Sequence, residues 1–183
     1  MKNFLPKIFR AKILSLKNIF SYFVISISLI CNISYADENK NMGEKQLAWN
    51  FTLKSQNAKN IKLSELRGNV IMLNFWASWC GTCLQQFPLL NTYYQKNKTQ
   101  DFILLSINID EDLLTATRLI QKRHFDYPVL FDPYNQTSQL YSIDDLPTIF
   151  IIDKDGFIRH TLDDSQLKQQ AITQQVIKDL LNE

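Results

Sequence analysis

The pattern of apolar and polar positions predicts a chain in which strands alternate with helices. Continuous apolar runs at 70–76, 101–109 and 128–131 are typical of strands buried on both faces of a sheet. Apolar residues recur three or four positions apart in four other stretches, and this spacing predicts helices. The expected helices span 80–97, which contains the kinking Pro88, 111–123, 135–141 and 166–182.

Two pairs of shorter strands complete the pattern. Residues 49–55 and 59–64 flank a polar turn, and residues 148–153 and 157–162 flank Lys154-Asp155-Gly156, which is a hairpin signal. Strands that are joined through helices must run parallel, whereas the late hairpin is antiparallel. The expected fold class is therefore α/β, with a mixed central sheet flanked by helices and an extra hairpin near the N-terminus.

The first 36 residues differ from the rest of the chain. They carry five basic residues and no acidic one, and the apolar run Ile19 to Ile33 is followed by Ser34-Tyr35-Ala36. This order predicts a secretory signal peptide that is cleaved after Ala36. An uncleaved membrane anchor is the alternative, although a spanning helix needs roughly 20 residues. We expect a polar linker at 37–47 and a single domain at 48–183, because 183 residues are few for two domains.

Export changes the charge and the cysteine content. The full chain has 20 basic and 18 acidic residues, whereas the mature chain keeps 15 basic residues and all 18 acidic ones, a net charge of −3. Such a chain has no basic patch for nucleic acid. Hydrophobic residues make up 45% of the chain, which predicts a globular fold. Cleavage also removes Cys31, so the mature domain keeps only Cys80 and Cys83.

The pair lies in the sequence NFWASWCGTC (74–83), at the junction of a predicted strand and a predicted helix. A disulfide between residues three apart closes a very short loop and removes little entropy from the unfolded chain, so the pair favours chemistry over stabilisation. The unpaired N–H groups at a helix start favour an anion. We therefore expect Cys80 to ionise below the free-thiol pKa of about 8.5 and to act as the nucleophile. Cys83, one turn further along, can then attack a mixed disulfide on Cys80 and release the partner.

Other uses of a Cys-x-x-Cys pair need residues that this chain lacks or places elsewhere. Zinc would need two further ligands, for which His124 and His160 are the only histidines. Covalent haem attachment needs a histidine after the second cysteine, where this chain has Leu84. A pair without function is the remaining alternative, and no metal site is predicted.

The residues FWASWCGTC, the downstream Leu146-Pro147-Thr148 before a strand, and the DKDG hairpin together resemble the thioredoxin superfamily. The most similar branch is the TlpA/ResA-type exported thiol–disulfide oxidoreductases, and the similarity extends from about residue 49 to 182. The resemblance implies a thioredoxin-like fold and a cis peptide bond before Pro147. It also implies substrate contacts from five residues beside the cysteines: Trp76, Trp79, Leu146, Pro147 and Thr148.

The same resemblance implies an activity and its partners. Members reduce disulfides in exported proteins outside the cytoplasm, often apocytochrome c, and take electrons from a membrane thiol reductase. The redox-active disulfide Cys80–Cys83 is the only redox group expected, so no separate cofactor is predicted. The expected location is the periplasm or another extracytoplasmic compartment, with a membrane tether if the N-terminal segment is not cleaved.

Four residues around the pair are expected to modulate it. The dipeptide Gly81-Thr82 tunes the redox potential, and many relatives have proline where this chain has Thr82. Thioredoxin has a buried aspartate where this chain has Asn74, and ResA-type relatives have a glutamate where it has Gln86. A neutral amide cannot take a proton at neutral pH, so the route by which Cys83 loses its proton is open.

The sequence leaves other functions of the same fold as alternatives. A disulfide-forming oxidase differs from a reductase only in redox potential. A thiol peroxidase would need a threonine three residues before its cysteine, where this chain has Ala77. A redox sensor or binding module without catalytic activity is the third alternative.

Overall fold

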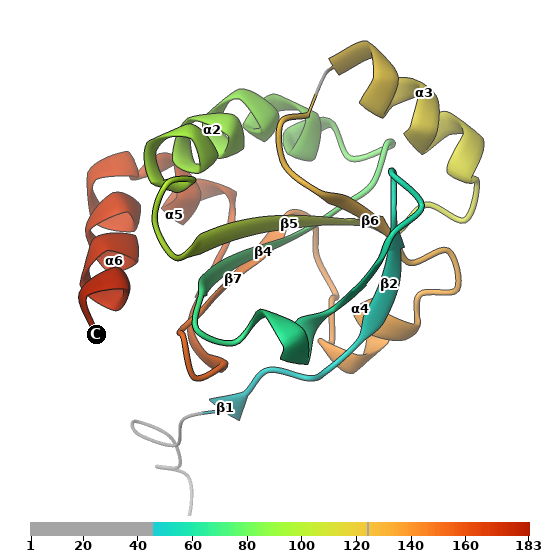
Figure 1. Ribbon diagram of the computed structural model, residues 1–183. Helices are drawn as coiled ribbons and strands as arrows, with labels where there is room; N and C mark the ends of the chain where they lie inside the picture. The colour runs from blue at the N-terminus through green and yellow to red at the C-terminus, as the bar shows by residue number, and fades with distance from the viewer. Residues whose placement is uncertain (1–45, 124) are drawn as a thin grey trace, which may run out of the picture. The chain divides into compact units, whose positions relative to one another are not determined.

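Strand β4 (Val70–Trp76) lies in the middle of the sheet in the computed structural model, which describes residues 46–123 and 125–183 (Figure 1). All seven β4 residues are buried, as expected for a strand covered on both faces. On one side β4 pairs in parallel with β5 (Phe102–Asn108), and β5 pairs in parallel with β6 (Val129–Phe131). On the other side it pairs antiparallel with β7 (Thr148–Ile152), which forms the predicted hairpin with β8 (Phe157–Leu162).

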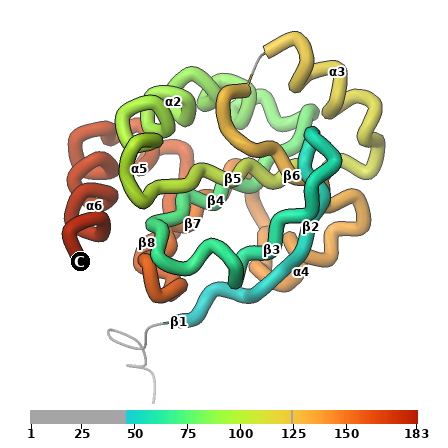
Figure 2. The backbone as a smooth tube through the Cα atoms, in the orientation of Figure 1, coloured from blue at the N-terminus to red at the C-terminus, as the bar shows by residue number. Residues whose placement is uncertain are grey.

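The N-terminal hairpin extends the sheet at one edge. Strands β2 (Thr52–Ser55) and β3 (Asn60–Lys62) pair antiparallel, and β2 also pairs with β6 (Figure 2). The predicted second strand is shorter than expected, because the chain continues as the 3₁₀ helix η1 (Leu63–Leu66). With β1 (Gln46–Leu47) at the opposite edge, the strand order among the described residues is β1-β8-β7-β4-β5-β6-β2-β3. The predicted mixed sheet and extra hairpin are thus confirmed.

The start of the described chain is a strand. Gln46 and Leu47, which the sequence assigned to the linker, form β1 and pair antiparallel with β8. Ala48 continues this attachment by donating its backbone N–H to the carbonyl of Gly156 at 2.9 Å. The ordered domain therefore begins before residue 48. The predicted signal peptide or anchor at 1–36 and linker residues 37–45 lie outside the described residues.

The helices follow the predicted order, with one difference at the C-terminus. The predicted helix at 166–182 is two helices, α5 (Asp164–Lys168) and α6 (Gln170–Asn182), separated by Gln169 with ψ of 67°. A capping box at Asp163 starts α5 earlier than the apolar spacing indicated. The remaining helices are α2 (Gly81–Asn97), α3 (Leu113–Arg123) and α4 (Gln136–Leu140).

Two apolar cores form on opposite faces of the sheet, because side chains alternate along each strand. Met72 and Trp76 of β4 face one core, which α2, α5 and α6 cover. Ile71 and Phe75 face the other core, which is closed by the segment before β2, by η1 and by Tyr141 after α4. Figure 1 shows α2 and α4 on opposite sides of the sheet. Strand β4, which leads to the two cysteines, is therefore held by packing on both of its faces.

No helix within residues 46–123 and 125–183 has the length and apolar character that a membrane span requires.

Candidate active site

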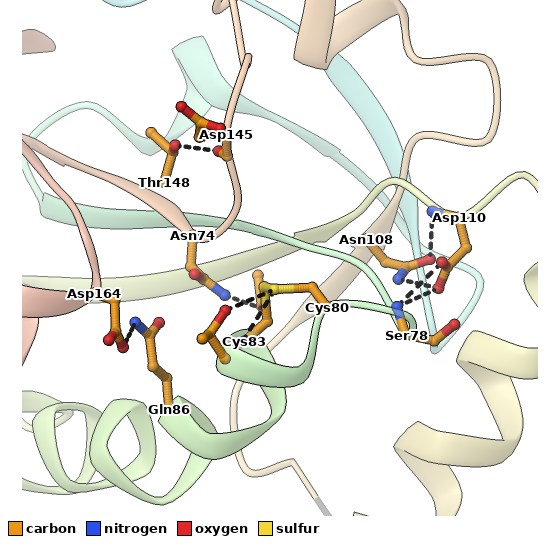
Figure 3. Close-up of a disulfide and its surroundings, with 12 residues drawn as sticks. Asn74, Ser78, Cys80, Cys83, Gln86, Asn108, Asp110, Asp145, Thr148 and Asp164 are labelled. Atoms are coloured by element: carbon orange, nitrogen blue, oxygen red, sulfur yellow. Dashed lines mark hydrogen bonds between the residues drawn. A yellow bond between two sulfur atoms is a disulfide. The ribbon is translucent and has the colours of Figure 1, made fainter.

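The two cysteines lie where β4 leads into α2. Cys80 is the N-cap of α2, with extended backbone angles, and Cys83 lies in the first turn. The Cys80 sulfur accepts a hydrogen bond from the backbone N–H of Cys83 at 3.1 Å (Figure 3). The two residues form a disulfide, with Cα atoms 5.3 Å apart. The sulfur that the sequence identified as the nucleophile therefore lies at the positive end of a helix dipole.

The two cysteines differ in exposure, as their proposed roles require. Cys80 is 6% exposed and Cys83 only 1%. Gly81 and Thr82, between them, are both exposed, and the Thr82 hydroxyl lies 3.3 Å from the Cys80 sulfur. Thr82 therefore provides a polar contact to the Cys80 sulfur that a proline at this position would lack.

The two predicted tryptophan contacts lie in different environments. Trp79 is 72% exposed immediately before Cys80, so its indole is available to a partner. Trp76 is fully buried, with its ring packed edge-on against Phe87 at 5.0 Å and stacked on Phe125 at 6.1 Å. The predicted substrate contact from Trp76 is therefore wrong for this conformation. The side chain points into the core because it alternates with Phe75 along β4.

The Leu146-Pro147-Thr148 segment leads into β7. Thr148 pairs with Phe75 near the carboxyl end of β4, the same end from which the chain reaches Cys80. The peptide bond between Leu146 and Pro147 is cis, as the resemblance implied. Pro147 is buried, Leu146 and Thr148 are half-buried, and the Thr148 hydroxyl donates to the carbonyl of Asp145 at 2.6 Å (Figure 3).

Asn74 and Gln86, the two amides that replace carboxylates of relatives, are both buried. Asn74 donates its Nδ2 to the Ser106 hydroxyl at 3.0 Å, and its Oδ1 has no hydrogen-bond partner among the described residues. Gln86 donates its Nε2 to Asp164 Oδ1 at 2.7 Å, and its Oε1 is likewise buried without a partner within the described part of the chain. Sequence reasoning missed Asp164, because α5 lies 78 positions further along the chain. Nothing in the local pattern indicated that pairing.

Asp110 is a second residue that sequence reasoning missed. It is 5% exposed and accepts the backbone N–H of Ser78 with both carboxylate oxygens, at 3.1 and 2.9 Å. Asn108 Nδ2 donates to the same carboxylate at 2.8 Å. The sequence position of Asp110, just beyond the predicted strand 101–109, could have indicated a role near the cysteines. The carboxyl ends of neighbouring parallel strands meet at the same edge of a sheet.

A cleft of about 530 Å³ opens beside Trp79. Ser78 and Ile109 line it, and Asp110, Glu111 and Asp112 contribute carboxylates. The hydrogen bonds from Leu114 N–H and the Thr115 hydroxyl lower the pKa of Asp112. The cleft is therefore lined by the aromatic Trp79, which directly precedes Cys80, and by acidic side chains.

The described part of the chain contains no cluster of side chains that could bind zinc. Within residues 46–123 and 125–183, no group of three or more His, Cys, Asp or Glu side chains is arranged to hold a metal ion. His160 is exposed on β8, and His124, the other candidate ligand, lies outside the described residues.

Comparison with known proteins identifies the family. The model of the AhpC/TSA family matches residues 45–161. The chain belongs to the AhpC/TSA family. It is 30% identical over 162 residues to the thiol-disulfide oxidoreductase ResA of Bacillus cereus, an alignment that spans 84% of this chain and 93% of that protein. It is 29% identical over 164 residues to ResA of Bacillus subtilis, spanning 86% and 88% of the two chains. This member of the family is a ResA-type thiol–disulfide oxidoreductase, as the sequence predicted.

Solved structures show the same fold. A structure assigned as a thiol:disulfide interchange protein DsbE from Chlorobium tepidum superposes with a TM-score of 0.68 at 32% identity, covering 74% of this chain and 96% of that one. One assigned as a protein disulfide isomerase from Bacteroides thetaiotaomicron gives a TM-score of 0.70 at 29% identity, covering 76% and 90%. The predicted thioredoxin-like fold is confirmed.

Proposed function

We propose that this ResA-type oxidoreductase works outside the cytoplasm and reduces disulfides in exported proteins through Cys80 and Cys83. The observation that carries the proposal is the position of the Cys80 sulfur, which caps α2 and accepts the Cys83 N–H. A thiolate at that position is stabilised by the helix dipole, by this hydrogen bond and by the contact with Thr82. The activity requires no cofactor beyond the disulfide itself.

The reaction proceeds in two exchanges. The Cys80 thiolate attacks one sulfur of the substrate disulfide, so that a mixed disulfide forms and the other substrate sulfur leaves as a thiolate. The Cys83 sulfur, having lost its proton, then attacks the Cys80 sulfur. The Cys80–Cys83 bond forms, the bond to the substrate breaks, and the second substrate sulfur leaves with its electron pair. Two electrons pass from the protein to the substrate.

The location and partners of this activity follow from the chain's N-terminal segment and from its chemistry. The basic start and the apolar run of residues 1–36 support export, with either cleavage or retention as a membrane tether. An oxidising compartment returns the pair to the disulfide, so turnover needs a thiol donor. We propose a membrane thiol reductase as that donor, and disulfide-containing exported proteins such as apocytochrome c as substrates.

Substrate contact is proposed for the exposed residues beside the cysteines. Trp79 offers an apolar surface at 72% exposure, and the half-buried Leu146 and Thr148 lie at the same end of the sheet. Leu146 packs against both cores, which fixes its backbone. An extended segment on either side of the substrate cysteine can therefore rest between Trp79 and the chain around Pro147.

Insulin reduction with a thiol donor tests the activity. We expect the wild-type protein to catalyse it, and Cys80→Ser to abolish it because the attacking sulfur is gone. Cys83→Ala is expected to accumulate a mixed disulfide with substrates, which identifies them when it is isolated from the exporting compartment. Full insulin reduction by Cys80→Ser would contradict the mechanism, whereas a wild-type protein that does not reduce insulin would support a non-catalytic sensor.

The redox potential separates a reductase from an oxidase. We expect a value well below the roughly −120 mV of DsbA, where 30 mV corresponds to about 1.4 kcal/mol for this two-electron couple. A potential near that of DsbA would reassign the protein as a disulfide-forming oxidase. Ala77 is fully buried and has no hydroxyl for a peroxide, so peroxide consumption should not exceed that of free thiols.

A further inference from the structure

A second cavity, of about 260 Å³, lies between α2 and the segment that leads into β6. Three aromatic residues form its walls, Phe87 of α2 and Phe125 and Tyr127 of that segment. Phe87 packs edge-on against Phe125 with ring centroids 4.6 Å apart, and Phe125 packs against Tyr127 at 5.4 Å. Figure 1 shows residues 125–128 passing beside α2. None of the described residues that line this cavity also lines the cleft beside Trp79.

Two polar atoms in the wall of this cavity have no hydrogen-bond partner among the described residues. Tyr127 is 1% exposed, and its hydroxyl is buried and unpaired. The Oδ1 atom of Asn91, one helical turn after Phe87, is also buried and unpaired. An unsatisfied buried polar group is unfavourable, and the large majority of such groups in folded proteins have a partner. The cavity therefore offers hydrogen bonds to a molecule that enters it.

The two unpaired atoms differ in the partner that they need. Burial, and to a smaller extent the negative charge of Asp126, raises the pKa of Tyr127, so its hydroxyl keeps its proton at neutral pH. This hydroxyl can donate, whereas the carbonyl oxygen of the Asn91 amide can only accept. A ligand group that both accepts and donates matches the pair, and a hydroxyl is such a group.

Arg123, the last residue of α3, supplies a positive charge at the exposed edge of the cavity. Its Nη1 donates to the carbonyl of Leu84 at 3.5 Å. In α2 the residue four positions later is Pro88, which has no N–H to offer this carbonyl. A guanidinium carries five N–H donors, so this one long hydrogen bond leaves others for an anion. The edge of the cavity is therefore suited to a carboxylate.

We propose that this cavity binds a small phenolic carboxylate with a single ring. Its ring packs between Phe87 and Phe125. Its hydroxyl pairs with the buried polar groups of Tyr127 and Asn91, and its carboxylate binds Arg123. The size is suitable, because a cavity of about 150 Å³ holds benzene and drug-sized ligands need about 300 Å³ or more. The inference goes beyond the proposed function and does not depend on it.

Two ligands of the same shape test the site. Isothermal titration calorimetry with the oxidised full-length chain measures the Kd of 4-hydroxybenzoate and of 4-methylbenzoate, in which a methyl group replaces the hydroxyl. We expect one equivalent of 4-hydroxybenzoate to bind with a Kd of about 1 mM or lower, as is usual for a ligand of this size. It should bind about tenfold more tightly than 4-methylbenzoate, because the methyl group leaves the buried polar groups unpaired.

Tyr127→Phe removes a hydroxyl that has no partner among the described residues, so we expect thermal unfolding to be unchanged. This variant should lose the preference for 4-hydroxybenzoate and bind 4-methylbenzoate at least as tightly as the wild type does. Tyr134→Phe is the matched control, because Tyr134 is 80% exposed and does not line the cavity. The control should keep the tenfold preference.

Arg123→Gln tests the carboxylate end of the site. We expect it to weaken the binding of both acids by up to about fivefold, the range for an exposed ion pair. Lys122→Gln removes the neighbouring positive charge of α3 and should leave both Kd values unchanged. Equal effects of the two substitutions would contradict the assignment of the carboxylate to Arg123.

The outcomes for the wild type decide between a ligand site and a cavity that holds only water. Absence of saturable binding in the millimolar range would overturn the inference. Equal affinity for the two acids, or a preference that survives in Tyr127→Phe, would also overturn it, because binding would then not use the buried hydroxyl. Insulin reduction is assayed separately, so its absence would reject the proposed function and leave this site unaffected.

Discussion

The carboxylate of Asp110 holds the chain segment that leads to Cys80. Its oxygens accept the Ser78 backbone N–H and the Asn108 amide, and all of these groups lie at the carboxyl ends of β4 and β5. Ser78 is only two residues before Cys80. A single buried side chain therefore connects the end of the neighbouring strand to the loop before α2.

We expect Asp110→Ala to lower the free energy of unfolding by about 1–3 kcal/mol, because it leaves the Ser78 N–H and the Asn108 amide without an acceptor. Urea unfolding of the oxidised proteins measures the change. Glu111→Ala is the matched control, since this neighbouring acid is exposed, and its effect should stay within about 0.5 kcal/mol. Equal effects of the two substitutions would show that Asp110 does not secure the loop.

At the scale of elements, the short helix α5 is joined to the long helix α2 by side-chain hydrogen bonds. It carries Asp164 to Gln86, and it is fixed by the Tyr93 hydroxyl, which donates to the carbonyl of Leu167 at 2.9 Å. Its start is set by Asp163, whose carboxylate accepts the Gln166 N–H at 2.8 Å. That hydrogen bond and the one from the Ser165 hydroxyl lower the pKa of Asp163.

The cap of α5 gives a pH-dependent prediction. The folded-state pKa of Asp163 lies below its unfolded value, so its stabilisation is present above about pH 4 and is lost as the pH falls through the folded value. Asp163→Asn retains a capping oxygen but does not titrate. Urea unfolding between about pH 5 and 2 should show a steeper loss of stability in the wild type than in the variant. Parallel curves in this range would contradict the assignment.

At the scale of the whole molecule, the described domain is held by its two cores and not by its disulfide. The sheet is covered on both faces, with residues such as Leu73, Leu104 and Ile151 fully buried. The disulfide joins residues separated by three positions and constrains the unfolded chain very little. The protein can therefore open and close this bond during turnover while its fold is kept.

We expect the reduced protein to remain folded, with a free energy of unfolding within about 2 kcal/mol of the oxidised form, which is the loop-entropy value for so short a closed loop. Urea unfolding with and without a strong reductant measures the difference. A double variant Cys80→Ser/Cys83→Ser gives the reference for a chain without either the bond or a thiolate. Global unfolding on reduction would show that the pair is structural.

The accuracy of the sequence predictions depended on how local the underlying interactions are. The buried run of β4, the helix beginning at Cys80 and the β7–β8 hairpin were predicted because each depends on neighbouring residues alone. The break at Gln169 was missed because apolar spacing continues across it, while the Asp163 cap and the Tyr93 contact with Leu167 divide the helix. The substrate contact expected of Trp76 came from the resemblance, whereas the apolar run 70–76 itself predicted a strand buried on both faces, and Trp76 is fully buried.

The sequence by itself determined the reactive pair, the strand-to-helix junction that carries it and the thioredoxin-like order of elements. Those features are encoded within a few residues of each other, where dihedral preferences and side-chain periodicity act. Only the tertiary structure decided that Asp110 binds the loop before Cys80 and that Asp164 of α5 pairs with Gln86 of α2. These contacts join residues 32 and 78 positions apart, and only packing of the strands and helices against one another brings such groups within hydrogen-bonding distance.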